Sequence, residues 1–152
     1  MKKNDRIPAL TLSATGQQDI DLSSLQGKKV VLYFYPRDNT SGCTQEGEDF
    51  RDHYAEFSQH NTVILGVSRD SVKTHEGFKA KYNFPFDLLA DRDEILCQAF
   101  DVLKPKMMFG KTGKGIVRST FLFDEQGILQ QSWSKVKVDG HVLDVLDAIK
   151  KL

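Results

Sequence analysis

The chain reads VVLYFYPRDNTSGC at residues 30–43, and the fold class can be worked out from this stretch. Residues 30–35 are all aliphatic or aromatic, and Pro36 follows them directly. A continuous apolar run of this length predicts a strand that is buried on both faces of a parallel sheet. Because proline cannot donate a hydrogen bond to a neighbouring strand, we expect the strand to end there.

The hydrophobic period changes after this strand. Apolar or small residues recur at alternating steps of four and three, at Cys43, Gly47, Phe50, Tyr54 and Phe57. This spacing places them on one face of an amphipathic helix over residues 42–59. Cys43 therefore lies in the first turn of a helix that directly follows a buried strand.

Strands and helices alternate along the rest of the chain. After a hairpin within residues 11–22, we expect further strands at 62–67, 86–89, 119–123 and 128–133, and helices at 71–82, 92–100 and 140–152. Residues 104–115, rich in Lys and Gly, are predicted to form a loop. This order predicts one α/β domain over residues 1–152, with a central mixed sheet flanked by helices, and thioredoxin-like topology fits it.

Composition excludes several classes of protein. Lys plus Arg and Asp plus Glu both number 21, so no basic excess points to nucleic acid. The longest apolar run is far shorter than the ~20 residues of a membrane span. Two cysteines make neither a disulfide scaffold nor a zinc spacing, and residues 1–6 lack the apolar stretch of a secretory signal. We expect a soluble, cytoplasmic protein that binds neither nucleic acid nor membrane and needs no metal or cofactor.

Cys43 is the residue best placed for chemistry. Ligands of open α/β sheets bind at the carboxyl ends of strands, and a helix start offers free N–H groups and a positive dipole that favour a thiolate. Thr40 lies one turn earlier and can direct its hydroxyl at a molecule approaching the sulfur, while Pro36 can shield the sulfur from water. Each also has a purely structural interpretation: Cys43 as a small buried hydrophobe, Thr40 as a helix cap, Pro36 as a strand terminator.

The spacing Pro36-x-x-x-Thr40-x-x-Cys43 resembles the active-site motif of the peroxiredoxins. Further stretches are similar to the bacterioferritin comigratory (PrxQ-type) subfamily, in the same order over nearly the whole chain: residues 31–36, 42–44, 46, 50–52, 110–112 and 115–122. The resemblance implies a thioredoxin-like fold and a peroxidase that reduces hydrogen peroxide and organic hydroperoxides.

The same resemblance implies roles for individual residues. Cys43 would be the peroxidatic nucleophile and become a sulfenic acid. Arg118 matches the family's active-site arginine, although alone it would read as an exposed charge on an edge strand. Together with the Thr40 hydroxyl and the N–H groups of Gly42 and Cys43, it would stabilise charge on the leaving oxygen. Glu46 either orients an arginine or is a solvated acid.

The chain departs from the family at the resolving cysteine. Many members carry it five residues after the nucleophile, where this chain has Glu48, and others carry it on the next helix, here residues 71–82, which contain none. Cys97 lies among apolar residues and is expected to be a packed structural thiol. We therefore expect a one-cysteine cycle in a monomer, with thioredoxin, glutaredoxin with glutathione, or another small thiol as reductant.

Other functions are less compatible with the residues. A thiol–disulfide oxidoreductase needs a Cys-x-x-Cys pair, but Thr40 and Glu46 occupy the candidate positions. A cysteine protease needs a histidine base, and the four histidines, His53, His60, His75 and His141, are expected at surface positions of helices. The same scatter argues against a metal site. A non-catalytic redox sensor or holdase, switched by oxidation of Cys43, remains the alternative from another class.

Overall fold

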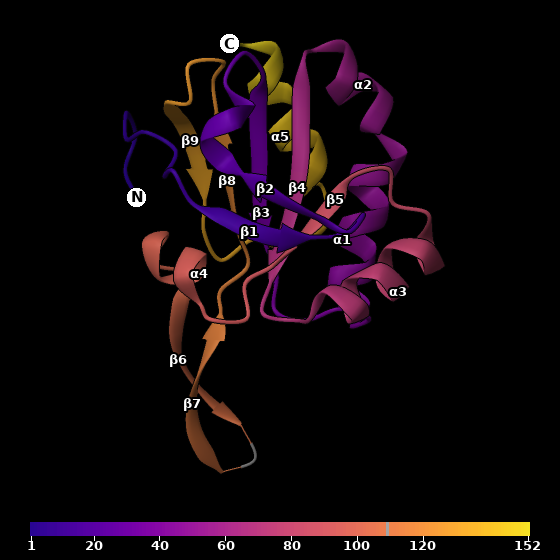
Figure 1. Cartoon of the computed structure of the whole chain (residues 1–152), viewed down its shortest axis with the longest axis vertical. Coiled ribbons are helices and arrows are strands. Elements are labelled where there is room, and N and C mark those ends of the chain that lie inside the picture. Colours follow the sequence, from indigo (N-terminus) through magenta and orange to yellow (C-terminus); the bar gives the residue numbers. More distant parts are fainter. Residues whose placement is uncertain (109) are drawn as a thin grey trace.

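A seven-stranded mixed sheet organises the computed structural model, which describes residues 1–108 and 110–152 (Figure 1). The strands are β1 (Thr11–Ala14), β2 (Gln18–Asp21), β3 (Lys29–Phe34), β4 (Thr62–Ser68), β5 (Asp87–Ala90), β8 (Ser119–Phe123) and β9 (Leu129–Trp133). Their order across the sheet is β2-β1-β5-β4-β3-β8-β9. The central strands β3, β4 and β5 run parallel, and the strands on both sides pair antiparallel. This is the predicted thioredoxin-like arrangement with an amino-terminal hairpin.

Helices cover both faces of the sheet. They are η1 (Leu22–Leu25), a 3-10 turn, and the α-helices α1 (Ser41–Asp52), α2 (Tyr54–Gln59), α3 (Val72–Tyr82), α4 (Ile95–Ala99) and α5 (His141–Lys150). None of the helices in the described part of the chain is long and apolar enough to cross a membrane.

The side chains on the two faces of β3 pack into two separate hydrophobic cores. Val30, Leu32 and Phe34 pack in one cluster, which also contains Cys97 of α4. The alternate residues Val31, Tyr33 and Tyr35 pack in the other cluster, which contains Cys43 of α1 and side chains of α2, α3 and α5. Because successive side chains of a strand point to opposite faces, Cys43 and Cys97 lie on opposite sides of the sheet.

The helix predicted over residues 42–59 is divided in two. His53 ends α1 with φ −107° and ψ 8°, and α2 begins at the next residue. The apolar stripe nevertheless continues across the break, since Phe50 and Phe57 are both fully buried. Hydrophobic spacing therefore predicted the buried face, but it did not predict the break between α1 and α2 at His53.

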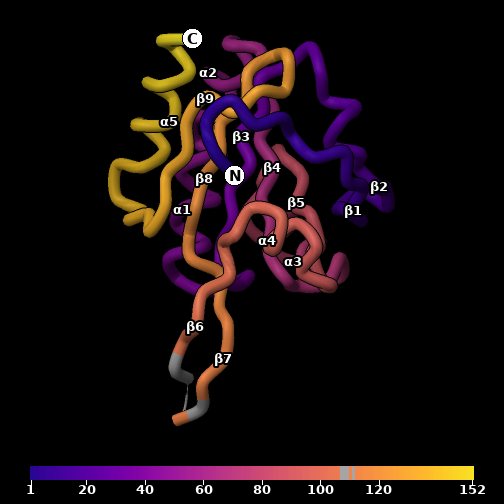
Figure 2. Tube along the Cα trace, turned by 90° about the vertical axis from the view of Figure 1, so that its left-hand side faces the viewer, coloured from indigo at the N-terminus to yellow at the C-terminus, as the bar shows by residue number. Residues whose placement is uncertain are grey.

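The loop predicted over residues 104–115 is wrong: the segment forms a second, two-stranded sheet. β6 (Leu103–Met108) and β7 (Lys111–Ile116) pair antiparallel, and residue 109 between them lies outside the described residues. Both views show this hairpin extending away from the main sheet (Figures 1 and 2). Most of the described side chains of the hairpin are exposed, among them Lys104, Lys106 and Thr112, so the segment lacks the apolar alternation from which strands are predicted.

Strand pairing brings the two halves of the candidate site together. β3 and β8 are antiparallel neighbours, with Phe34, the last residue of β3, opposite Ser119, the first of β8. The residue before β8 is Arg118, and the loop after β3 leads into α1 and Cys43. The end of the sheet at which β3 stops therefore carries both Arg118 and Cys43.

Candidate active site

Cys43 is buried at the start of α1, with only 2% of its surface exposed. Thr40 precedes the helix in the N-cap position with extended backbone, φ −81° and ψ 156°, and its carbonyl accepts the N–H of Thr44 at 2.9 Å. Backbone N–H groups in a first helical turn have no partner within the helix. Cys43 thus lies in the first turn of α1, at the positive end of the helix dipole.

Arg118 joins Cys43 to Glu46. Its Nη2 donates to the sulfur of Cys43 at 3.5 Å, and its Nη1 donates to Oε1 of Glu46 at 2.7 Å. Glu46 can bind the same guanidinium because it follows Cys43 by three residues, which places both side chains on one face of α1. Gly42 permits the close approach of Arg118, since a Cβ atom at residue 42 would lie 3.1 Å from Nη2.

Glu46 is fully buried, so its interpretation as a solvated acid is wrong. Its Oε2 has no hydrogen-bond partner among the described residues. Burial raises the pKa of Glu46 to about 7, although the Arg118 guanidinium acts in the opposite direction. For Arg118, burial lowers the pKa, but Glu46 and Cys43 together outweigh it and the pKa is raised. Arg118 therefore stays charged beside the sulfur.

Glu46 should make stability depend on pH. Because its pKa rises from 4.5 to about 7 on folding, the folded protein holds a proton that the unfolded chain has released. Its contribution is present below pH 4.5, is lost as the pH rises toward 7, and amounts to roughly 3 kcal/mol. Urea unfolding at pH 4.5 and 7.5 should show wild type losing about this much relative to Glu46→Gln. A difference between the two proteins that does not change with pH would contradict the raised pKa.

Thr40 and Pro36 lie at the same loop but are not joined to Cys43 by hydrogen bonds. The Thr40 hydroxyl donates to the carbonyl of Arg37 at 2.9 Å, and its side chain makes no helix-capping bond. Pro36 is half-buried and lies two residues after Phe34, where β3 ends, one residue earlier than predicted. Roles for Thr40 and Pro36 toward a bound peroxide stay predictions.

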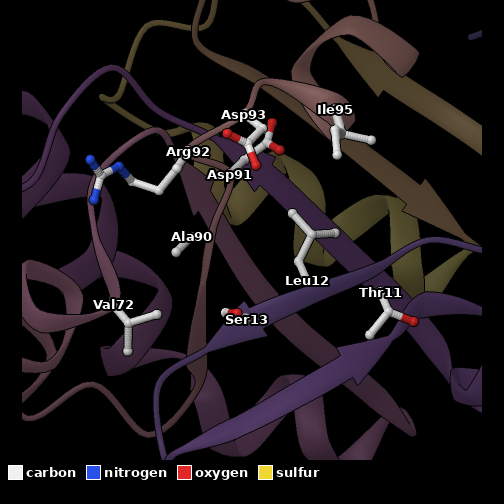
Figure 3. Close-up of a pocket in the computed structure, with 9 residues that line it drawn as sticks. All are labelled: Thr11, Leu12, Ser13, Val72, Ala90, Asp91, Arg92, Asp93 and Ile95. Atoms are coloured by element: carbon white, nitrogen blue, oxygen red, sulfur yellow. The ribbon is translucent and has the colours of Figure 1, made fainter.

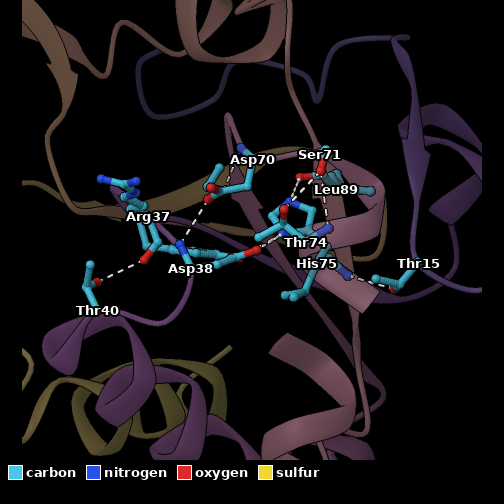
Figure 4. A network of polar contacts seen from close by, with 12 residues as sticks. Thr15, Arg37, Asp38, Thr40, Asp70, Ser71, Thr74, His75 and Leu89 are labelled. Atoms are coloured by element: carbon cyan, nitrogen blue, oxygen red, sulfur yellow. Dashed lines mark hydrogen bonds and ion pairs between the residues drawn. The ribbon is translucent and has the colours of Figure 1, made fainter. Parts of the chain in front are cut away.

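The expectation of four surface histidines is wrong for His75 and His141, which are both buried. Nε2 of His141 pairs with Oγ1 of Thr120 at 2.8 Å, and burial lowers the pKa of His141 to about 4, so its ring is neutral at pH 7. His75 lies in a polar network with Asp38 and Tyr35, and Figure 4 shows its contact with Asp38, which stands between Arg37 and Thr40 in the loop before α1. The sequence signal for His75 was its position three residues before the buried Phe78 on α3.

Asp38, Asp70 and His75 place three possible metal ligands within 4.8 Å of one another. Protein groups already occupy these atoms. Nδ1 of His75 pairs with Asp38 at 2.7 Å, and Oδ2 of Asp70 accepts from the Ser68 hydroxyl and the Asp38 N–H. The three side chains therefore form a closed hydrogen-bond network rather than an open set of metal ligands.

A cavity of ≈ 330 Å³ lies between β1, β5 and the start of α4 (Figure 3). Its lining includes Leu12, Asp91 and Ile95 but not Cys43. Asp91 accepts from the backbone N–H groups of Leu96 and Cys97, at 3.1 and 2.7 Å, so it fixes the start of α4. This cavity is therefore separate from the group formed by Cys43, Glu46 and Arg118.

Comparisons with known proteins agree with this geometry. The sequence matches the AhpC/TSA family over residues 4–132. It is 52% identical over 141 residues to Peroxiredoxin Bcp of Xanthomonas campestris, covering 93% of this chain and 88% of that protein. It is 48% identical over 147 residues to Peroxiredoxin Bcp of Bacillus subtilis, covering 97% and 94%.

A solved structure of the bacterioferritin comigratory protein of Xanthomonas campestris, which addresses that protein's alkyl peroxide reduction activity, superimposes with a TM-score of 0.92. The sequence identity is 48%, over 99% of this chain and 98% of the other. The family match, these relatives and the shared fold agree: the chain belongs to the AhpC/TSA family and is a peroxiredoxin of the Bcp (PrxQ) type, a thiol-dependent peroxidase.

Proposed function

We propose that Cys43 is the peroxidatic nucleophile and that the chain reduces alkyl hydroperoxides and hydrogen peroxide in a one-cysteine cycle. The observation that carries this proposal is the buried sulfur of Cys43 lying 3.5 Å from the guanidinium of Arg118. The alkyl peroxide reduction activity of the similar Xanthomonas protein supports the substrate class.

The chemical step balances as a two-electron oxidation of sulfur. The Cys43 thiolate attacks the outer oxygen of ROOH, an S–O bond forms and the O–O bond breaks. The departing RO⁻ takes a proton and leaves as ROH, while Cys43 becomes a sulfenic acid. Negative charge moves from sulfur to the leaving oxygen, so donors fixed at that position stabilise the transition state more than the ground state.

Three groups can supply these donors. Arg118 is held by Glu46 against the sulfur and carries several N–H donors in a planar arrangement. The backbone N–H groups at the start of α1 are free of helical partners. We also propose that the Thr40 hydroxyl turns from Arg37 to the bound peroxide, and that Pro36 limits the access of water to Cys43.

Cys97 is a poor resolving partner for Cys43. It is fully buried on the opposite side of the sheet, and burial, aided by Asp91, raises the pKa of its thiol. A thiol held in this way is inert, because the thiolate is the reactive form. An external thiol would instead attack the Cys43 sulfenic acid, release water and form a mixed disulfide, which a second thiol reduces.

Mass spectrometry under non-reducing conditions tests the one-cysteine cycle. After one equivalent of hydroperoxide, we expect sulfenic acid at Cys43 and an unmodified Cys97. In the presence of a small thiol, the expected product is a mixed disulfide at Cys43. An intramolecular Cys43–Cys97 disulfide as the main product would refute the cycle, and Cys97→Ala is the matched control.

A turnover assay distinguishes the peroxidase from a redox sensor or holdase. Hydroperoxide consumption is followed with the thioredoxin system and, in parallel, with glutaredoxin and glutathione. We expect many turnovers with at least one donor, and the faster donor is the proposed reductant. Consumption of one equivalent followed by arrest with both donors would favour the sensor.

We further propose that the protein acts as a monomeric single domain in the cytoplasm. The amino-terminal segment pairs with the carboxyl-terminal half through the Arg6–Ile128 bridge, which supports one domain over residues 1–152. Both cysteines are free, which is usual in a compartment where thiols are kept reduced. Sedimentation and cell fractionation test these two points, and a stable dimer or a membrane-bound pool would contradict them.

A further inference from the structure

His75 is fully buried between two hydrogen-bond acceptors. Its Nδ1 lies 2.7 Å from Oδ2 of Asp38, and its Nε2 lies 2.9 Å from the carbonyl oxygen of Leu89. A carbonyl oxygen and a carboxylate can only accept, so with Asp38 as a carboxylate the two contacts need an N–H on each ring nitrogen. The geometry fits such a pair between His75 and Asp38.

The groups that face this ring come from several elements. Tyr35, directly after β3, has its hydroxyl 3.5 Å from Nδ1, and Asp70 follows β4. Burial raises the pKa of Tyr35, so its hydroxyl stays protonated and donates to Oδ1 of Asp38 at 2.6 Å. Asp38 thus satisfies both carboxylate oxygens, one with Tyr35 and one with His75.

Asp38 is also held through its backbone, whose N–H donates to Oδ2 of Asp70 at 2.9 Å (Figure 4). Asp38 lies between Pro36 and Thr40, in the loop that connects β3 to α1 and ends just before Cys43. Its neighbours Arg37 and Asn39 are exposed, whereas Asp38 is buried. The buried side chain of Asp38 therefore attaches this loop to the protein interior.

We propose that the Asp38–His75 ion pair positions the active-site loop and keeps Cys43 covered and aligned for attack on peroxide. The proposal rests on the proposed role of Cys43. Among the described residues, neither Asp38 nor His75 forms a hydrogen bond with the sulfur of Cys43. Both are therefore positioning residues that act through the loop backbone. Removing either side chain should free the loop and misplace Cys43, while the contact between Arg118 and Glu46, which involves no loop residue, should stay.

Two reactions of Cys43 report on the loop. In His75→Asn and Asp38→Ala, we expect the rate constant for oxidation by cumene hydroperoxide to fall roughly 10- to 100-fold, because small misplacements of a catalytic group have effects of that size. Alkylation by iodoacetamide should become faster in the same variants, since the sulfur loses its cover. Because partial unfolding would also expose the sulfur, urea unfolding of each variant is measured alongside, and a control variant destabilised away from the loop separates loss of positioning from loss of stability.

Two further variants complete the design. Asp38→Asn keeps an acceptor for Tyr35 and can donate to a neutral His75, so it should recover most of the peroxide rate lost in Asp38→Ala. Leu129→Ala is the control. It removes a buried side chain of β9 that lies opposite Phe123, at the end of β8 far from Arg118, and it should leave both reactions of Cys43 within 2-fold of wild type.

Nitrogen NMR of the wild-type protein tests the ion pair directly. Both ring nitrogens of His75 should give the signals of N–H groups at pH 7. A single N–H would overturn the ion pair, and peroxide rates within 2-fold of wild type in both Asp38→Ala and His75→Asn would overturn the positioning role. If His75→Asn does not fold, Asp38→Asn and the NMR signals still decide.

Failure of the proposed function gives a different result. If wild-type Cys43 does not react with hydroperoxide, the proposed function fails, while the NMR signals and the iodoacetamide rates still report on the Asp38–His75 pair.

Discussion

Replacing Cys43 with serine should lower the rate of hydroperoxide reduction by at least about 10⁴-fold, because removal of a covalent nucleophile leaves only binding and charge stabilisation. A serine hydroxyl stays protonated at neutral pH and cannot take up oxygen from the peroxide as sulfur does. The fold should survive, since serine is close in size to cysteine and keeps a partner for Arg118.

The measurement is a peroxide-consumption assay with the better thiol donor, together with urea unfolding of the same protein. Cys97→Ala is the matched control, because it also removes a buried thiol but from the opposite core. It should retain turnover despite a loss of stability from the cavity it leaves. A Cys43→Ser protein that still consumed peroxide at the wild-type rate would remove Cys43 from the mechanism.

Replacing Arg118 with alanine should lower the rate constant for Cys43 oxidation about 10²- to 10³-fold, the usual effect of removing a donor fixed at a site of developing charge. Arg118→Lys should recover little of it, because lysine keeps the charge but cannot contact Cys43 and Glu46 through two arms of one planar group. Stopped-flow measurement of the oxidation step isolates this effect from the reductant.

Arg118→Ala also leaves the Glu46 carboxyl buried without its partner, which costs about 3–5 kcal/mol when the charge is retained. The double variant Arg118→Met with Glu46→Gln removes that charge and should regain stability without regaining the rate. An Arg118→Ala protein that reacts within 3-fold of wild type would show that the guanidinium does not act on the peroxide.

Local sequence patterns predicted the parts of the fold that bury a periodic apolar face. The run at residues 30–35 predicted β3, and the spacing of Cys43, Gly47 and Phe50 predicted the inner face of α1. Ser71, the first residue of the predicted helix, caps α3, since its hydroxyl accepts the Thr74 N–H at 3.2 Å. Each of these features depends on residues close together in the chain.

Features that depend on tertiary contacts were less predictable. Most described side chains of the β6–β7 hairpin are exposed, so its lysines and glycines suggested a loop. In α5, Leu143 is as apolar as its neighbours Val142 and Leu146, yet it is exposed, whereas Val145 is fully buried.

The site itself divides in the same way. Cys43, Thr40 and Pro36 are visible as a motif, but the pairing of Arg118 with Cys43 spans 75 residues and exists only because β8 pairs with the end of β3. Glu46 could not be assigned from sequence, since a carboxylate near the start of a helix is usually solvated. The Asp38–His75 pair was missed because a histidine on an amphipathic helix gives no sign of what it faces.

The central claim is that peroxide oxidises one sulfur, that of Cys43, and it can be measured directly. The wild-type protein is treated with one equivalent of cumene hydroperoxide in the presence of dimedone, which traps sulfenic acids, and the adduct is located by tandem mass spectrometry. The account predicts close to one adduct per chain, on Cys43, and none on Cys97. An adduct found mainly on Cys97, or peroxide consumed without any oxidation of Cys43, would contradict it.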